Sequence, residues 1–126
     1  MTFNVWIFVW RKAGTTPEEF RTHYENSHVP LIKSLTGSLF PQSHIRHYVA
    51  RGEDGTAPMV ILGTPEDFTY DAFAELSFTD AAAFQQFFGV IGQGEPAVKI
   101  AEDEEKFVQR EKTRAVVVGD VTKTFH

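Results

Sequence analysis

Four segments of the chain carry the alternation of apolar and polar positions that predicts β-strands. Residues 3–10, "FNVWIFVW", place β-branched and aromatic side chains on both alternating sets, which predicts a strand buried on both sides. Residues 43–51 and 69–78 predict a second and a third strand, and residues 113–125 predict a fourth. Residues 52–67 are rich in Gly and Pro and predict a long excursion between the two middle strands.

The clearest helix signal lies between the first two strands. Thr16 is the expected N-cap, Pro17 the first helical residue, and Glu19 the second half of a capping box. Apolar residues then recur at helical spacing, and Gly37 offers a C-terminal stop. The pattern predicts one amphipathic helix between Thr16 and Gly37.

A second helix is expected after Thr79 and Asp80, where apolar residues again recur at helical spacing. Residues 89–97 contain glycines with no preceding strand, which predicts a flexible rim loop, and residues 101–107, "AEDEEKF", predict an acidic, helical connector. The resulting β-α-β-β-α-β order predicts one domain over residues 1–126, of the α+β class, with a ferredoxin-like fold and an antiparallel four-stranded sheet.

Two helices cover only one face of such a sheet, so the two alternating sets of strand residues need different surroundings. The small or aliphatic set is expected beneath the helices, together with His47: Val5, Ile7, Val9, Ile45, Val49, Ala72, Ala74 and Leu76. The opposite set mixes bulky aromatic with polar side chains: Asn4, Trp6, Phe8, Trp10, His44, Arg46, Tyr48, Asp71, Phe73 and Glu75. This mixture is too aromatic for water and too charged for a dry core, and it is typical of a ligand cavity. A second copy of the sheet is the simplest cover for that face.

The segment "HYENSHVPLI" places titratable groups on the stripe of the first helix that should be buried. His28 follows Tyr24 by four residues and therefore lies at the edge of this stripe. Pro30 has no N–H and crowds the carbonyl four residues before it, which predicts a loosened turn beside His28. The pattern favours a pocket role for His28, the alternative being a histidine that caps a packed core. His23 is expected to be structural or on the surface.

Composition and charge exclude several classes of function. The formal net charge is −5 without a run of basic residues, so nucleic-acid binding is not expected. The absence of Cys excludes disulfides and Cys-ligated zinc. No segment has the pattern of a membrane span or signal peptide, which makes the cytoplasm the expected location. A metal site made of His28, His44 and Asp71 lacks any supporting motif, so neither a metal nor a cofactor is expected.

Several segments together resemble the EthD family of dimeric α+β-barrel proteins: "WIFVWRKAGTTPEEFRTHYENSHVPLI", "IRHYV", "YDAFAELSF" and "AEDEEKF". The resemblance spans nearly the whole chain except residues 52–67, and it is most specific at "HYENSHVPL" and "YDAFAELSF". It implies a homodimer whose two sheets close a barrel around a pocket. It does not imply one activity, because the family and its wider fold include decarboxylases, dehydratases and cyclases acting on polyketides, an accessory factor in ether degradation, and more distant monooxygenases.

The leading hypothesis is a cofactor-independent lyase or cyclase that acts on an aromatic or polyketide-derived small molecule. His28, assisted by Asp71, is the expected acid–base catalyst, with His44 and Tyr48 as further catalytic candidates. The substrate-binding candidates are Trp6, Phe8, Trp10, Tyr24, Arg46, Phe73 and Glu75. Three alternatives stay open: a cofactor-free or haem-linked monooxygenase with His28 as axial ligand, a non-enzymatic binding protein, and a purely structural ion-pair ladder of Asp71 and Glu75 with Arg46.

Overall fold

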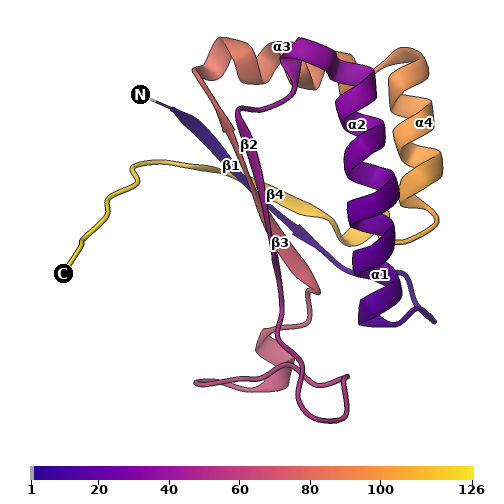
Figure 1. The fold of residues 1–126 in the computed structure, drawn as a ribbon, viewed down its shortest axis with the longest axis vertical. Coiled ribbons are helices and arrows are strands. Elements are labelled where there is room, and N and C mark those ends of the chain that lie inside the picture. Colours follow the sequence, from indigo (N-terminus) through magenta and orange to yellow (C-terminus); the bar gives the residue numbers. More distant parts are fainter. Residues whose placement is uncertain (1) are drawn as a thin grey trace.

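The computed structural model describes residues 2–126 and has the predicted α+β, ferredoxin-like architecture (Figure 1). An antiparallel four-stranded sheet has the order β2-β3-β1-β4. Its strands are β1 (Phe3–Val9), β2 (Ser43–Tyr48), β3 (Ala72–Phe78) and β4 (Arg114–Val118). The helices are α1 (Pro17–His23), the π-helical η1 (Tyr24–His28), α2 (Val29–Thr36), α3 (Ala81–Ile91) and α4 (Gly94–Glu104). Short 3₁₀ turns are η2 (Gly37–Leu39), η3 (Pro65–Asp67) and η4 (Arg110–Lys112).

The predicted helix boundaries are confirmed at both ends of the first helical segment. The side chain of Thr16 accepts a hydrogen bond from the N–H of Glu19, and the Glu19 side chain accepts one from the N–H of Thr16. Pro17 is the first helical residue, where its missing N–H removes no intrahelical bond. Gly37 ends α2 with a φ of 54°, a left-handed value that favours glycine.

Residues 89–97 do not form the expected flexible loop. They contain the end of α3, a tight turn, and the start of α4. Pro96 lies in the first turn of α4, a position that proline tolerates. The additional helix α4 forms because its residue Ile100 is apolar and buried, and Phe107, just beyond the helix, is buried as well. The acidic segment 101–107 therefore has an inner side that packs on the core.

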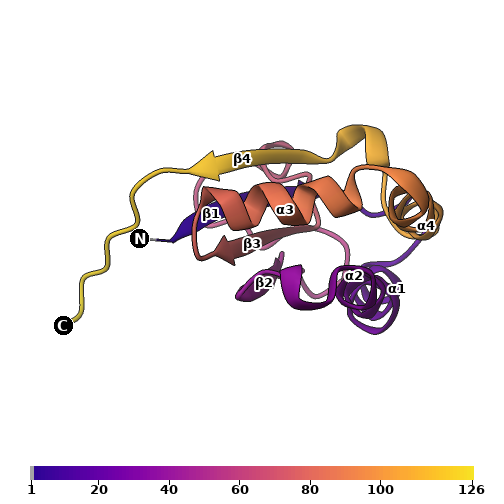
Figure 2. The same ribbon diagram turned by 90° about the horizontal axis from the view of Figure 1, so that it is seen from above.

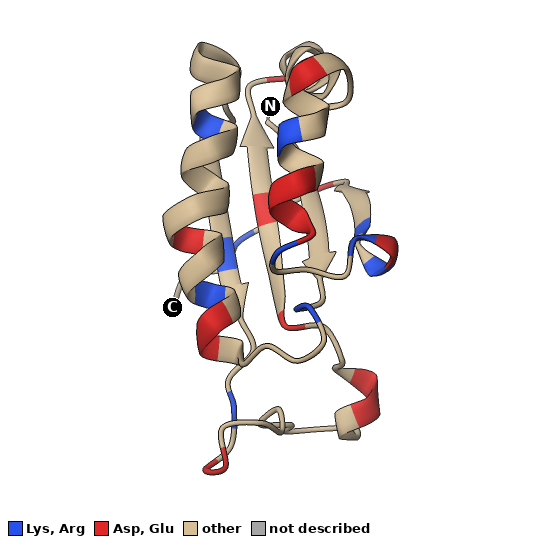
Figure 3. Ribbon diagram, turned by 90° about the vertical axis from the view of Figure 1, so that its right-hand side faces the viewer, with Lys and Arg blue, Asp and Glu red and all other residues tan. Residues whose placement is uncertain are grey.

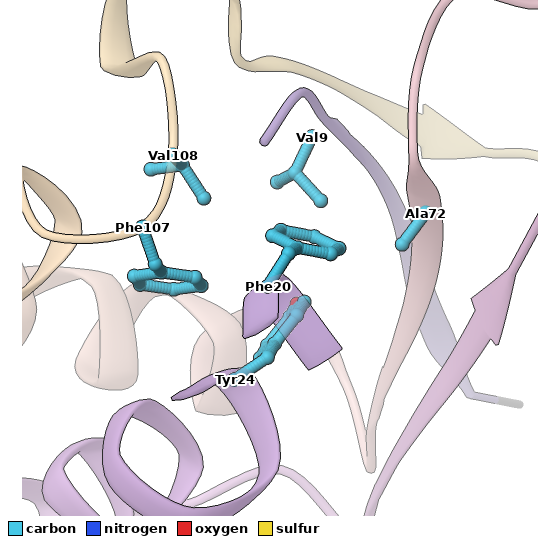
Figure 4. Packing of buried hydrophobic residues seen from close by; sticks show 6 residues of the cluster. All are labelled: Val9, Phe20, Tyr24, Ala72, Phe107 and Val108. Carbon is cyan, nitrogen blue, oxygen red and sulfur yellow. The ribbon is translucent and has the colours of Figure 1, made fainter. Parts of the chain in front are cut away.

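All helices lie on one side of the sheet (Figures 1 and 2). Between them and the sheet lies the core, which includes the fully buried rings of Phe20 and Phe78. Figure 4 shows the part around Phe20, where Tyr24 and Phe107 pack from the helical side against Val9 and Ala72 of the sheet. Within residues 2–126, no helix is both long and apolar enough to cross a bilayer.

The other side of the sheet, here called the open face, has no cover within one chain. Its side chains include Trp6, Phe8, Ile45, His47, Phe73, Glu75, Arg114 and Val116. Trp6 is 38% exposed, Ile45 45% and Val116 54%, so the first strand is not buried on both sides in a single chain. The expected orientation is confirmed for Trp6 and for the three residues that surround it: Phe8, Phe73 and Glu75.

The expected orientation is wrong for β2. His44 pairs with Leu76, Arg46 with Ala74 and Tyr48 with Ala72, and paired side chains share one face, here the face beneath the helices. His47 instead stacks on Phe73 on the open face, with ring centroids 4.6 Å apart.

Glu25 of η1 is the physical reason for this orientation of β2. Its carboxylate accepts hydrogen bonds from Arg46 Nε and Nη2 at 2.6 and 2.8 Å and from Tyr48 Oη at 2.5 Å. The hydrogen bonds from Arg46 are the largest cause that lowers the pKa of Glu25 to about 2. The alternative ladder of Arg46 with Asp71 and Glu75 does not form, because Arg46 is paired with Glu25 of the helix.

Asp71 is a buried anchor directly before the start of β3. One of its oxygens accepts from Arg11 Nη1 at 2.6 Å and Arg51 Nη2 at 2.5 Å, and the other accepts from the Arg11 N–H at 2.7 Å. Asp71 is only 4% exposed, so these two arginines are the partners that make its burial tolerable. The carboxylate therefore ties the start of the excursion to the end of β1.

We expect Asp71→Ala to lower the free energy of unfolding by about 3 kcal/mol, because it leaves two guanidinium groups without their shared partner. Urea denaturation followed by circular dichroism measures the change. Glu66→Ala, at an exposed carboxylate of the same excursion, is the control and should stay close to the wild-type stability. An equal effect of the two substitutions would contradict the anchoring role.

Candidate functional site

A small cavity of about 140 Å³ lies between the sheet and the helices. Tyr24, His28, His44, Glu104 and Thr113 are its polar wall residues. The remaining walls are apolar and come from both layers: Ile7, Val9, Ile32, Phe40, Pro41, Leu76, Phe87, Ile91, Ile100, Phe107 and Val108. The pocket expected on the opposite side of the sheet requires a second copy of the chain and stays a prediction, whereas this apolar cavity of the single chain lies beneath the helices.

A larger, more open groove of about 470 Å³ runs past the start of α1. Its wall includes Arg51 and Asp71, which pair with each other, and Arg21, which lies over the ring of Tyr48. This groove is more open to solvent, so we assign the chemistry to the smaller cavity, whose wall includes two imidazoles.

The turn that carries Tyr24 and His28 is locally widened, as the position of Pro30 predicts. The N–H of Val29 bonds to the carbonyl of Tyr24, five residues back, which makes η1 a π-helical turn. Pro30 supplies no N–H at the next position, so the regular ladder is not restored there. Tyr24 and His28 are buried together, with ring centroids 5.8 Å apart, and π-helical turns are frequent at functional sites.

Asp103 of α4, and not Asp71, is the carboxylate that holds His28. Its Oδ2 lies 2.9 Å from Nδ1 of His28, and its Oδ1 lies 3.0 Å from both Nε2 of His23 and Oγ of Ser27. Burial acts to raise the pKa of Asp103, but the hydrogen bonds from His28, Ser27 and His23 outweigh it and hold the pKa below its usual value. His23 is thus structural, as expected.

The role of Asp103 was missed because the acidic run 102–105 reads as a solvated surface (Figure 3). A signal was nevertheless present in the sequence. Asp103 follows Ile100 by three residues and precedes Phe107 by four, so it lies on the apolar stripe of its helix. An acidic residue on such a stripe needs a buried partner.

His28 is arranged as a neutral base. Since Asp103 accepts at Nδ1, that nitrogen carries the proton and the lone pair of the ring is left on Nε2; His28 itself is a wall residue of the cavity. Burial lowers the pKa of His28, while Asp103 and Glu104 oppose this shift. Oε2 of Glu104 lies 4.0 Å from Nε2. The carboxylates therefore stabilise the imidazolium that forms when His28 takes a proton.

His44 and Tyr24 complete the polar end of the cavity. The Tyr24 ring lies near both imidazoles, 5.8 Å from His28 and 6.1 Å from His44. Burial, aided by the charge of Arg46, lowers the pKa of His44 to about 4, and burial raises the pKa of Tyr24. Among residues 2–126, the ring nitrogens of the half-buried His44 form no hydrogen bond to a side chain or to the backbone. Both groups are thus neutral near pH 7 and can donate to an oxygen of a ligand.

The other expected site residues lie away from this cavity. Trp10 packs on Tyr70 at the edge of the open face, near the four residues already placed there. Arg46 and Tyr48 lie beneath the helices but are bound to Glu25, and Asp71 is bound to two arginines. In the part of the chain that the structure describes, no three His, Asp or Glu side chains are placed to hold a metal ion.

Solved structures share this fold at low identity. An EthD family protein of Bacillus halodurans is 14% identical, with a TM-score of 0.58 over 94% of this chain and 99% of that chain. An EthD-like protein of Ralstonia eutropha is 14% identical, with a TM-score of 0.57 over 93% and 87%. A protein of Bacteroides fragilis, described as dimeric and of unknown function with a ferredoxin-like fold, is 8% identical, with a TM-score of 0.55 over 93% and 94%.

No curated protein matches the chain in sequence. The sequence model of the EthD domain, however, matches residues 12–111, which form most of the chain. These residues include the whole of the cavity's helical wall, from α1 to α4. The chain therefore belongs to the EthD family.

Proposed function

We propose that the protein is a cofactor-independent lyase or cyclase that moves a proton on an aromatic or polyketide-derived small molecule. One observation carries the proposal: the buried His28 is a wall residue of an apolar cavity, and Asp103 holds its Nδ1 at 2.9 Å. This pairing orients the ring, selects its tautomer and stabilises its protonated form, which are the requirements of a general base.

The reaction begins when Nε2 of His28 takes a proton from a carbon next to a carbonyl group. Negative charge then develops on the carbonyl oxygen. Hydrogen bonds from His44 or Tyr24 stabilise this charge, because both groups are neutral donors, Tyr24 buried and His44 half-buried. The resulting enolate can expel a β-hydroxyl group as water or attack a second carbonyl carbon to close a ring. His28 returns its proton in the last step.

The geometry favours this reaction over two alternatives. A haem-linked monooxygenase needs room for a porphyrin beside His28, and the cavity of about 140 Å³ is far smaller. A purely ligand-binding protein has no need for a buried carboxylate that fixes the tautomer of one imidazole, since packing alone would hold the ring.

We also propose that the protein is a homodimer that buries the open face of its sheet. Trp6, Phe8 and Phe73 form an aromatic patch there, with Ile45 and Val116 half-exposed beside it. Monomeric proteins rarely leave such a patch in water. The Bacteroides fragilis protein with the same fold is described as dimeric, which supports this arrangement.

Sedimentation equilibrium is expected to give the mass of a dimer at micromolar concentration. Trp6→Glu should shift the protein to monomers, because it places a charge in the centre of the buried patch. Glu53→Gln, in the exposed excursion, serves as the control and should leave the dimer intact. A wild-type protein that sediments as a monomer would contradict the proposal.

His28→Gln is expected to lower turnover about 100-fold, the usual scale for a lost general base, while the fold is retained. Dehydration of a cyclic β-hydroxy ketone, followed by the ultraviolet absorbance of the enone, provides the assay. Asp103→Asn should also lower turnover, since it disturbs the tautomer that makes His28 a base. His47→Gln is the control: it makes the same substitution on the open face, away from the cavity, and should leave turnover close to the wild-type value. Near-normal turnover in His28→Gln would overturn the assignment.

Stability should fall as the pH is lowered, because the folded state keeps His44 neutral. The folded pKa of about 4 lies below the usual histidine value of 6.5, so the stabilisation is complete above pH 6.5 and is lost between pH 6.5 and about 4. We expect His44→Asn to reduce the loss measured between about pH 7.5 and about pH 5 by roughly 2 kcal/mol. Urea denaturation at the two pH values tests this. An unchanged pH dependence in His44→Asn would show that His44 is not buried as a neutral group.

A further inference from the structure

We infer that the substrate is an uncharged molecule about the size of a single six-membered ring, and that the cavity rejects carboxylates. The inference rests on the proposed function, since it names the substrate class of the same site. It also decides among the reactions that the site could perform, because dehydration and ring closure have neutral substrates while decarboxylation does not.

The size of the proposed substrate follows from the volume of the cavity and from the packing of its apolar walls. The cavity encloses about 140 Å³ between strand residues such as Ile7 and Leu76 and helix residues such as Phe87 and Ile100. Ile100, Phe87 and Leu76 are buried in the packed core, so these walls have little freedom to retreat. An apolar cavity of about 150 Å³ binds benzene, and the present cavity therefore accepts one ring with short substituents.

The preference for an uncharged substrate follows from the charges of the residues that line the cavity. No Lys or Arg side chain lines the cavity, and Glu104 is its one charged wall residue. Behind His28 lies a second carboxylate, Asp103, so even a protonated His28 is already compensated by two acidic groups. A bound carboxylate would therefore meet Glu104 without a cation to pair with, in a poorly solvated space.

Neither nearby arginine is free to neutralise such a ligand. Arg46 lies beyond His44 and holds Glu25 with two hydrogen bonds, at 2.6 and 2.8 Å. Arg110 binds the other oxygen of Glu104, at 3.0 Å, and is half-exposed on the outside of the molecule. This ion pair also holds the Glu104 side chain in position at the cavity wall.

The remaining polar groups fit a neutral oxygen-bearing ligand. Nε2 of His28 is an acceptor, and the unpaired imidazole of His44 and the hydroxyl of Tyr24 are neutral donors. For a β-hydroxy ketone, Nε2 of His28 takes the proton from the carbon between the two functional groups. The carbon–oxygen bond to the hydroxyl group then breaks, and the departing hydroxide leaves with that proton as water. The products are an enone and one molecule of water, and no oxidant or reductant is consumed.

Benzamide and benzoate test the charge rule, because they have the same shape and differ in charge at pH 7. Isothermal titration calorimetry with the wild-type protein is expected to show benzamide binding at least about tenfold tighter than benzoate, the scale of one unfavourable charge contact in a partly buried site. Naphthalene carboxamide, which adds a second ring, should bind at least about tenfold more weakly than benzamide.

Glu104→Gln removes the charge and keeps the shape of the wall, so it should bring benzoate to within about threefold of benzamide. Glu105→Gln, an exposed position at the end of the same helix, is the matched control and should keep the wild-type preference. Benzoate binding as tightly as benzamide to the wild-type protein would overturn the inference, and so would tight binding of the two-ring amide. Because these titrations measure binding, their outcome is independent of whether His28→Gln abolishes turnover.

Discussion

One buried carboxylate, Asp103, connects the parts of the molecule on which the site depends. A carboxylate that is 6% exposed is tolerable only with several donors, and His23, Ser27 and His28 supply them from a single stretch of helix. This requirement fixes α4 against α1 and η1, and so closes the helical wall of the cavity. The same hydrogen bond determines which nitrogen of His28 carries the proton. The hydrogen bond between Asp103 and His28 therefore both anchors α4 and prepares His28 to act as a base.

Glu25 is a second anchoring carboxylate, which holds strand β2 against the helix. It binds Arg46 and Tyr48, and because strand side chains alternate, this orients all of β2 and turns His44 toward the cavity. The two carboxylates thus act on opposite flanks of η1. The π-helical turn between them carries Tyr24 and His28, which need not be held by the regular helix ladder when their neighbours are held by ion pairs and hydrogen bonds.

The sequence predicts the features of this protein that depend on neighbouring residues. The capping box at Thr16 and the widened turn before Pro30 are local, and both are confirmed. The orientation of β2 could not be predicted from its alternation, because Ile45 is one of few aliphatic residues there and the deciding partner, Glu25, lies on a helix. The partner of His28 lies 75 residues away, and a carboxylate on the apolar stripe of a helix does not reveal which group it meets. Features set by neighbouring residues could therefore be predicted from the sequence, whereas pairings between residues far apart in the chain could not.

The sequence suggested that one face of the sheet carries both the aromatic residues that a second copy would cover and the polar residues of a pocket. In the structure, the aromatic patch and the cavity lie on opposite faces of the sheet. Aromatic side chains of β1 and β3 gather on the open face, where a second copy would bury them, while the polar residues of β2 turn toward the helices. The cavity is already formed within a single chain. A substitution on the open face should accordingly act through stability and assembly, and one at His28, His44 or Glu104 through binding and chemistry. The ferredoxin-like sheet can keep these roles apart because neighbouring residues of a strand point in opposite directions.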